Sequence, residues 1–341
     1  MTGPVLPDVL AGVVIVSLNA YVLLAGADFG GGVWDLLATG PRKTDQRHLV
    51  AEAIGPVWEA NHVWLILALV VLFTCFPPVF AQLGIQLHIP FVLALIGIVL
   101  RGSAFAFRSY GGERDDAQRR WGRVFAIASV VTPLVLGTAV GAVASGKVAP
   151  GAITNDFWAA YVQPWLNAFG VAVGVFALAC FAFLAAVYLT LEAEDAALRD
   201  DFRRRALVAQ GGVIVAGIVA LALSGDVAPS VASGLLGAPW ASALHLLGAT
   251  AAAVAVAALW RRRWVIARIA AASEVSLILW GWALGQYPYI LPPDFTVDGA
   301  AAPTFTLQLV LGALFLGGAV LFPSLYYLFR VFKASPPEAA Q

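Results

Sequence analysis

Residues 166–190 read LNAFGVAVGVFALACFAFLAAVYLT and contain no charged side chain. A helix needs about 20 mostly apolar residues to cross a bilayer, so this stretch is long enough for one span. Four arginines follow closely, at position 199 and at 203–205. A long apolar run that ends in a basic loop is typical of a helix that leaves the bilayer on its cytoplasmic side. This stretch therefore predicts an integral membrane fold.

The composition extends this prediction to the whole chain. Of the 341 residues, 61% are hydrophobic and 12% are charged, whereas soluble domains carry about 25% charge. The net charge of zero gives no basic footprint for nucleic acid. Cys75 and Cys180 lie inside apolar runs, so we expect small buried side chains rather than a disulfide or a metal site. The N-terminus shows no basic region or A-x-A cleavage pattern, so we expect the first span itself to act as the insertion signal.

Nine stretches of the chain are long and apolar enough to span a membrane. They lie near residues 8–27, 62–83, 85–106, 124–145, 166–190, 206–225, 240–260, 264–286 and 305–331. Pro77, Pro78 and Pro90 punctuate the second and third spans, which we expect a tight connector to join. The prediction is an all-α membrane protein with a single integral membrane domain over residues 1–341, arranged as two four-helix bundles and one peripheral helix.

The basic residues give these spans an orientation. They follow the odd-numbered spans, in clusters such as Arg42–Arg47, Arg199–Arg205 and Arg261–Arg263, and of the 20 Lys and Arg residues only Lys147 falls on the other side. The positive-inside rule makes the basic side cytoplasmic, with the N-terminus outside and the C-terminus inside. Lipid-binding patches are an alternative for these loops, but topology explains them more simply.

Three acidic residues lie in or beside spans: Asp28, Glu59 and Glu274. An ionisable group at that depth is costly and is a functional candidate by default. Asp28 precedes Gly30–Gly32 in the segment GADFGGG, where glycines allow close backbone approach or end the helix. The alternative for Asp28 is an interfacial acid with its carboxylate in water. Glu274 is a possible buried polar site, either for a proton or as a link to another helix, and its partner should lie on a different helix.

Polar and aromatic residues crowd into the stretch 52–66, EAIGPVWEANHVWLI, at the start of the second span. Glu59 and His62 share one helical face, and partial burial would favour the protonated carboxyl of Glu59, which could then pass protons. The alternative is helix capping and interfacial anchoring by the two tryptophans. The loop 286–306, QYPYILPPDFTVDGAAAPTFT, is rich in Pro and Tyr and predicts a rigid extracytoplasmic cap.

Other kinds of chemistry find little support. His62, His88 and His245 share no i, i+4 spacing and have no nearby cysteine pattern, so we expect neither a metal nor a haem bound by this chain. The sequence has no Walker-type phosphate loop, H-E-x-x-H or C-x-x-C motif. GADFGGG lacks the preceding strand that a dinucleotide site needs.

The block PVWEANHVWL at 56–65 resembles the P-x-W-[DE]-x-N-x-V-W-L block of subunit II of the cytochrome bd-type quinol oxidases. GADFGGG resembles the G-x-D-x-G-x-G segment of the same family, and TCFPPVFA with Phe76, LRGSAFAFR and QYPYILP resemble later family segments. The similarity covers essentially the whole chain. The tryptophan-rich block is the specific part of it, whereas the glycine segment alone is a weak signal.

The resemblance implies a heterodimer with a homologous subunit I, which carries haems of b and d type and the quinol site. The complex oxidises quinol and reduces O₂ to water in the respiratory chain of a bacterial or archaeal cytoplasmic membrane. It takes its chemical protons from the cytoplasm and is electrogenic. Small single-helix accessory subunits, and a lipid or structural quinone in a groove of this chain, are further partners that the family allows.

The resemblance also assigns roles to residues. Glu59 matches an acidic position of a cytoplasmic proton-entry path, with Asp28 as a second member of that path. Trp64 matches a tryptophan near an oxygen-entry route, and Trp58, Asn61, Asp28 and Arg101 match positions that order the subunit interface. The sequence differs from the family pattern at two positions, Ala25 and Ala106, where some members carry an acid. The resemblance therefore implies a proton path with fewer side-chain proton carriers.

Two other classes of function stay open at this point. A stand-alone transporter could use Asp28, Glu59 and Glu274 as proton or ion sites, and discontinuous spans in matching halves would support it. A purely structural scaffold predicts that all three acids can be neutralised with little effect.

Overall fold

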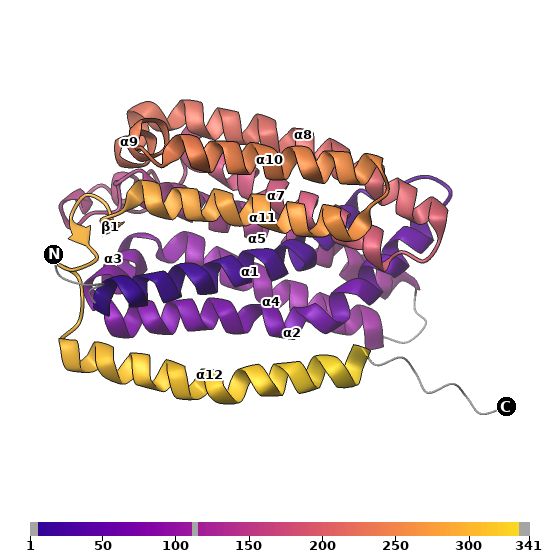
Figure 1. Cartoon of the computed structure of the whole chain (residues 1–341), viewed down its shortest axis with the longest axis horizontal. Helices are drawn as coiled ribbons and strands as arrows, with labels where there is room; N and C mark the ends of the chain where they lie inside the picture. Colours follow the sequence, from indigo (N-terminus) through magenta and orange to yellow (C-terminus); the bar gives the residue numbers. More distant parts are fainter. Residues whose placement is uncertain (1–5, 111–114, 334–341) are drawn as a thin grey trace.

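The computed structural model describes residues 6–110 and 115–333, without the side chains of 54–60, 108–110, 115–119, 322, 325 and 328–333. The long helices are α1 (Leu6–Leu36), α2 (Lys43–Cys75), α4 (His88–Tyr110), α5 (Asp115–Ala144), α7 (Ala168–Glu192), α8 (Ala196–Val227), α10 (Ala241–Trp260), α11 (Trp264–Gln286) and α12 (Thr304–Lys333). The short elements are α3 (Pro77–Gln86), a 3-10 turn (Pro150–Ala152), α6 (Phe157–Tyr161), α9 (Pro229–Gly237), β1 (Tyr289–Leu291) and β2 (Phe295–Thr296). Figure 1 shows the long helices lying side by side along one common direction.

The described helices confirm a mainly helical membrane protein. Within the described ranges, 8 helices are long and apolar enough to cross a membrane, or up to 9 if one bent pair counts as a span. The predicted stretch 166–190 corresponds to α7, and 206–225, 240–260 and 264–286 correspond to α8, α10 and α11. Local hydropathy is sufficient to locate these helices. A segment that crosses a bilayer has to form all of its backbone hydrogen bonds within itself and carry apolar side chains, and both are local properties of about 20 residues.

The prediction for the second span, residues 62–83, is wrong in its second half. Helix α2 stops at Cys75, and α3 leaves at 116° to the segment Asn61–Cys75. Pro77 and Pro78 open α3, where the missing N–H groups cost nothing because first-turn donors have no partner inside the helix. The connection that we expect between the second and third spans therefore includes the whole of α3. Only Leu87 separates α3 from α4, which begins at His88.

The first span is also longer than the predicted 8–27, since α1 continues through the glycines to Leu36. A Cβ on Gly30 would lie 2.0 Å from the carbonyl oxygen of Phe181 on α7, and one on Gly26 would lie 2.5 Å from the side chain of Leu184. The glycines thus permit close helix packing, as small residues do in membranes. The alternative that they end the helix is wrong.

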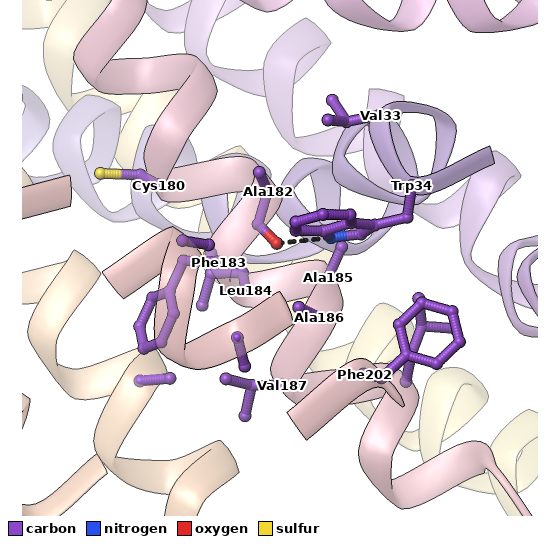
Figure 2. Close-up of a cluster of buried hydrophobic side chains, with 14 of the residues drawn as sticks. Val33, Trp34, Cys180, Ala182, Phe183, Leu184, Ala185, Ala186, Val187 and Phe202 are labelled. Carbon is purple, nitrogen blue, oxygen red and sulfur yellow. Dashed lines mark hydrogen bonds between the residues drawn. The ribbon is translucent and has the colours of Figure 1, made fainter. Parts of the chain in front are cut away.

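Helix α7 occupies the centre of the fold and packs against α1, α5, α8 and α11. Its contact with α5 is also made by glycines, because a Cβ on Gly137 would lie 2.6 Å from the Cα of Gly174. Figure 2 shows part of the surrounding core, where the Trp34 indole of α1 donates a 2.8 Å hydrogen bond from Nε1 to the carbonyl of Ala182. Phe202 of α8 belongs to the same buried cluster.

Helix α12 lies at the edge of the molecule, separated from α8 and α10 in Figure 1. It packs mainly against α1 and α2, and only 6% of its most apolar window is buried inside this chain. Its attachment is fixed near its start, where the backbone N–H of Ala302 donates a 2.8 Å hydrogen bond to the carbonyl of Cys75 at the break between α2 and α3.

The loop 286–306 contains the two strands found among the described residues, in a fold predicted to be all-α. Strands β1 and β2 pair antiparallel in a short hairpin. Leu291 and Val297 are buried in it, and the Gln286 side chain donates a 3.0 Å hydrogen bond to the carbonyl of Ile290. The loop is thus a structured cap on one end of the helices, as its composition predicts.

The glycine contact between α1 and α7 leads to a stability prediction. Gly30→Ala should lower the unfolding free energy by about 1–3 kcal/mol, because the atom it would meet is backbone and cannot move aside cheaply. Gly12→Ala, on the same helix, meets nothing within 4 Å and serves as the matched control. Thermal unfolding of the purified protein in detergent measures both variants. Equal melting temperatures for the two would contradict the packing argument.

Candidate functional site: a buried ion pair joining four helices

Asp28 of α1 forms a fully buried ion pair with Arg101 of α4. The exposed fractions of the two side chains are 0% and 1%. The guanidinium donates from Nη1 to Asp28 Oδ2 at 2.8 Å, from Nη2 to Oδ1, and from Nη2 to the Asp28 backbone carbonyl at 2.9 Å. Both carboxylate oxygens are therefore engaged, and the alternative that this carboxylate lies in water is wrong.

Two further helices contribute to the same cluster. Asn61 of α2 donates from Nδ2 to Asp28 Oδ2 at 3.0 Å. Arg101 Nε donates to Ser129 Oγ of α5 at 3.0 Å, and the Ser129 hydroxyl donates a hydrogen bond to the carbonyl of Phe125 at 2.7 Å. The four side chains Asp28, Asn61, Arg101 and Ser129, which we call the polar cluster, connect α1, α2, α4 and α5.

Aromatic rings enclose the arginine of the polar cluster. The Cζ of Arg101 lies 4.9 Å from the ring centre of Phe29 and 4.8 Å from that of Phe125. A guanidinium over a ring face gains electrostatic attraction, and more of it when water is excluded. The rings thus stabilise the charge while keeping solvent away from it.

Glycine also supplies the space that the polar cluster needs. A Cβ on Gly32 would lie 2.1 Å from Ser129 Oγ, and one on Gly97 would lie 2.1 Å from Thr132 Oγ1. The first contact brings α5 close to α1, and the second brings it close to α4. The glycines of GADFGGG thus serve both the packing of α7 and the position of Ser129.

The tryptophan-rich block lies on α2 beside the polar cluster. Asn61 is fully buried, and Trp64 packs against the buried group formed by Tyr21, Ala25 and neighbours. The ring of His62 meets Tyr21 edge-on, with 6.3 Å between ring centres. Trp58 and Glu59 are on the same helix, but their side chains lie outside the described residues. The predicted roles of Trp58 and Glu59 therefore stay predictions.

Glu274 lies apart from the polar cluster, in the middle of α11, and is 5% exposed. Gln210 of α8 donates to its Oε1 at 2.7 Å. The prediction that the partner of Glu274 sits on another helix is confirmed. Gln210 itself was not singled out, although an amide inside the apolar run 206–225 is the kind of signal that could have found it.

Sequence reasoning also missed a second ion-pair network, at the end of the molecule where the basic loops meet. Arg42 donates to both carboxylate oxygens of Asp201, at 2.9 and 2.6 Å, and Gln46 donates to the same group at 3.0 Å. The hydrogen bond to Asp201 raises the pKa of Arg42 above its usual range. Arg205 of α8 donates to Gln46 of α2 at 2.7 Å, so this network joins the start of α2 to the start of α8.

The described histidines do not come together. His62 lies on α2, His88 on α4 and His245 on α10, and the Nδ1 of His88 is 2.8 Å from the carbonyl of Ile85. Among the described residues, no group of three or more His, Cys, Asp or Glu side chains is placed to hold a metal ion. Cys75 and Cys180 are free and buried, as their apolar surroundings predict.

Together, the long apolar helices and the polar cluster define a multi-pass membrane protein whose buried charges are held by its own side chains. The model of the family "Cytochrome bd terminal oxidase subunit II" matches residues 6–332. The chain belongs to this family.

Relatives agree with this assignment. The chain is 30% identical over 214 residues to cytochrome bd ubiquinol oxidase subunit 2 of Bacillus subtilis, covering 62% of this chain and 60% of the relative. It is 29% identical over 179 residues to cytochrome bd-I ubiquinol oxidase subunit 2 of Escherichia coli K12, covering 52% and 46%. The aligned part thus spans about half to three fifths of the length of these relatives.

The fold matches over a greater length than the sequence does. A chain in the structure of bd oxidase from Geobacillus thermodenitrificans superposes with a TM-score of 0.79 at 22% identity, covering 98% of this chain and 100% of that one. At this identity the likeness is one of fold. It shows that a chain of this overall fold occurs in a solved bd oxidase.

The polar cluster leads to a prediction about buried charge. Asp28→Asn should cost about 3–5 kcal/mol of stability, because it leaves the Arg101 guanidinium buried without its counter-charge. The double variant Asp28→Leu with Arg101→Met should cost less than the single one, since it removes both charges. Thermal unfolding compares them.

Arg204→Gln is the matched control for an exposed ion pair. Arg204 bonds to Asp200 at 3.1 Å, but its side chain is 75% exposed, so its loss should cost no more than about 1 kcal/mol. If Asp28→Asn were as mild as Arg204→Gln, the buried pair would not be a central element of this fold.

Proposed function

We propose that this chain is the non-haem subunit II of a cytochrome bd-type quinol:O₂ oxidoreductase in the cytoplasmic membrane of a bacterium or archaeon. The observation that carries the proposal is the family match over residues 6–332. The relatives in B. subtilis and E. coli are named as subunits of ubiquinol oxidases, which favours a quinol as the electron donor.

In this proposal a homologous subunit I carries the b- and d-type haems and the quinol site, and those haems supply the electron transfer to O₂. This chain forms a heterodimer with subunit I and contributes a single integral membrane domain. Accessory single-helix subunits and a bound lipid or structural quinone complete the set of partners that the family allows.

The proposed topology places the N-terminus outside and the C-terminus in the cytoplasm. In support, the loop after α1 meets the start of α8 at one end of the molecule, through the contacts of Arg42 with Asp201 and of Arg205 with the Leu37 carbonyl. Figure 1 shows that end opposite the N-terminus. We group the helices as one bundle of α1, α2, α4 and α5, a second of α7, α8, α10 and α11, and the peripheral α12.

Within this topology Glu59, which lies well inside α2, is the proton carrier of a path that enters from the cytoplasm. Asn61 follows it by two positions and is fixed to Asp28 by a hydrogen bond of 3.0 Å. Asp28 has both oxygens engaged by Arg101, so its part in the path is a fixed negative charge that holds α2 in position. Trp64, packed beside Tyr21 and Ala25, forms a wall of an apolar route for oxygen.

The stand-alone transporter is not favoured. The family match and the full-length likeness in fold both connect the chain to oxidase subunits.

Glu59→Gln should slow quinol-dependent O₂ consumption by the assembled complex by about tenfold or more, because the amide cannot carry a proton. Glu52→Gln is the matched control, since Glu52 lies on the same helix with its side chain 66% exposed, and it should leave turnover unchanged. Oxygen uptake with added quinol measures the rates.

Haem content, read from the absorption spectrum of the purified complex, separates the possible results. Slow turnover with normal haem content supports proton entry through Glu59. Normal turnover with normal haem content would contradict that role and favour a purely structural scaffold. Purification without a haem-bearing partner would contradict the proposed complex itself.

A further inference from the structure

The contact between Gln210 and Glu274 joins two membrane helices through a single hydrogen bond. Gln210 is 2% exposed and Glu274 is 5% exposed, and both lie near the middle of their helices, α8 and α11. The residues of the largest buried cluster that lie within one helical turn of either side chain are small and apolar: Ala206, Ala209, Val213, Ala270, Ala271 and Val275. The Cys180 thiol of α7 is also close to Glu274. Water is therefore excluded from a pair of strongly polar groups.

Gln210 and Glu274 each have one side-chain oxygen that accepts no hydrogen bond from the described residues. Glu274 Oε2 and Gln210 Oε1 are both buried, and neither has a hydrogen-bond partner among the described residues. An amide oxygen accepts only, and an ionised carboxylate also accepts only. If Glu274 were ionised, two acceptors would remain unsatisfied within one contact, and each would cost its full desolvation penalty.

Among the residues that the structure describes, none forms an ion pair with Glu274, whose one hydrogen bond comes from the neutral amide of Gln210. The nearest cation on α11, Arg268, lies over the ring of Tyr188 on α7, 5.0 Å from its centre. The titratable side chains of α7 in this region are the Cys180 thiol and the Tyr188 phenol, while α10 has only the exposed His245 and α9 has none. On α1, Asp28 is already paired with Arg101. An isolated carboxylate in such surroundings is neutralised rather than kept.

We propose that Glu274 is a proton-binding site and that it holds its proton in a closed acid–amide pair with Gln210. The added proton sits on Glu274 Oε2, and the resulting O–H donates to Gln210 Oε1. Gln210 Nε2 continues to donate to Glu274 Oε1. One proton thus converts a single hydrogen bond with two orphaned acceptors into two hydrogen bonds that satisfy both side chains.

This site is independent of the proposed oxidase function. It lies on α8 and α11, whereas Asp28 and Glu59 belong to α1 and α2. In chemical terms the ligand is a single proton, bound at a carboxyl oxygen between two helices. The pair needs no path to either surface, because a proton taken up during folding is retained as part of the structure.

Infrared difference spectroscopy tests the proposal on the purified protein with whatever subunits accompany it. A protonated carboxyl has a C=O stretching band that is well separated from that of a carboxylate and shifts in D₂O. Subtracting the spectrum of Glu274→Gln at neutral pH should reveal such a band in the unchanged protein. Gln210→Leu should keep the band but move it to higher frequency, since the acid then lacks its hydrogen-bond partner. If neither difference spectrum contains a carboxylic acid band, the site is ionised and the proposal is wrong.

Thermal unfolding gives a second, independent arm. The amide of Glu274→Gln can donate to Gln210 and accept from it, so its melting temperature should equal that of the unchanged protein. Glu274→Ala leaves Gln210 buried without partners and should melt lower, whereas Ser273→Ala, on the exposed side of the same helix, should not. A loss of stability in Glu274→Gln as large as in Glu274→Ala would show that the charge is required, and would overturn the proposal. Neither arm depends on oxidase activity.

Discussion

The burial of Asp28 against Arg101 is the constraint on which the first half of the structure depends. Two opposite charges removed from water are stable only if their geometry is good and their remaining donors and acceptors are occupied. This requirement accounts for the rest of the polar cluster, since Asn61 supplies a donor to the carboxylate and Ser129 supplies an acceptor to the guanidinium. The two phenylalanine rings complete the enclosure. The registers of α1, α2, α4 and α5 are thereby fixed relative to one another.

The other helix contacts need a different source of stability. Lipid is itself apolar, so moving an apolar side chain from lipid into the protein contributes little. Van der Waals attraction between closely packed helices has to stabilise the fold, and glycines allow the helices to approach closely enough for it. Gly30 and Gly174 bring α1 and α5 against the backbone of α7. The polar cluster and the glycine contacts act together, because the glycine segment that meets α7 also contains Asp28 and the space for Ser129.

The sequence alone predicts the helices well and their contacts poorly, for physical reasons that particular residues show. A span such as 166–190 can be recognised because crossing a bilayer is a local requirement on about 20 residues. Asp28 stands out because an acid in a span is costly, but Arg101 lies 73 positions away and was assigned only to a subunit interface. Gln210 and Asp201 looked like ordinary polar residues, because what distinguishes them is a partner on a distant segment. The break at Phe76 was visible as two prolines, but the 116° direction of α3 depends on the tertiary environment.

The position of α7 has a mechanical consequence. Its backbone touches that of α1 at Phe181 and that of α5 at Gly174, with no side-chain atoms between them to deform. A helix clamped in this way cannot slide or tilt against its neighbours without steric overlap, since packed interiors resist small displacements. The positions of α1, α5 and α7 are therefore coupled: a displacement of any one of the three helices would force the other two to move with it.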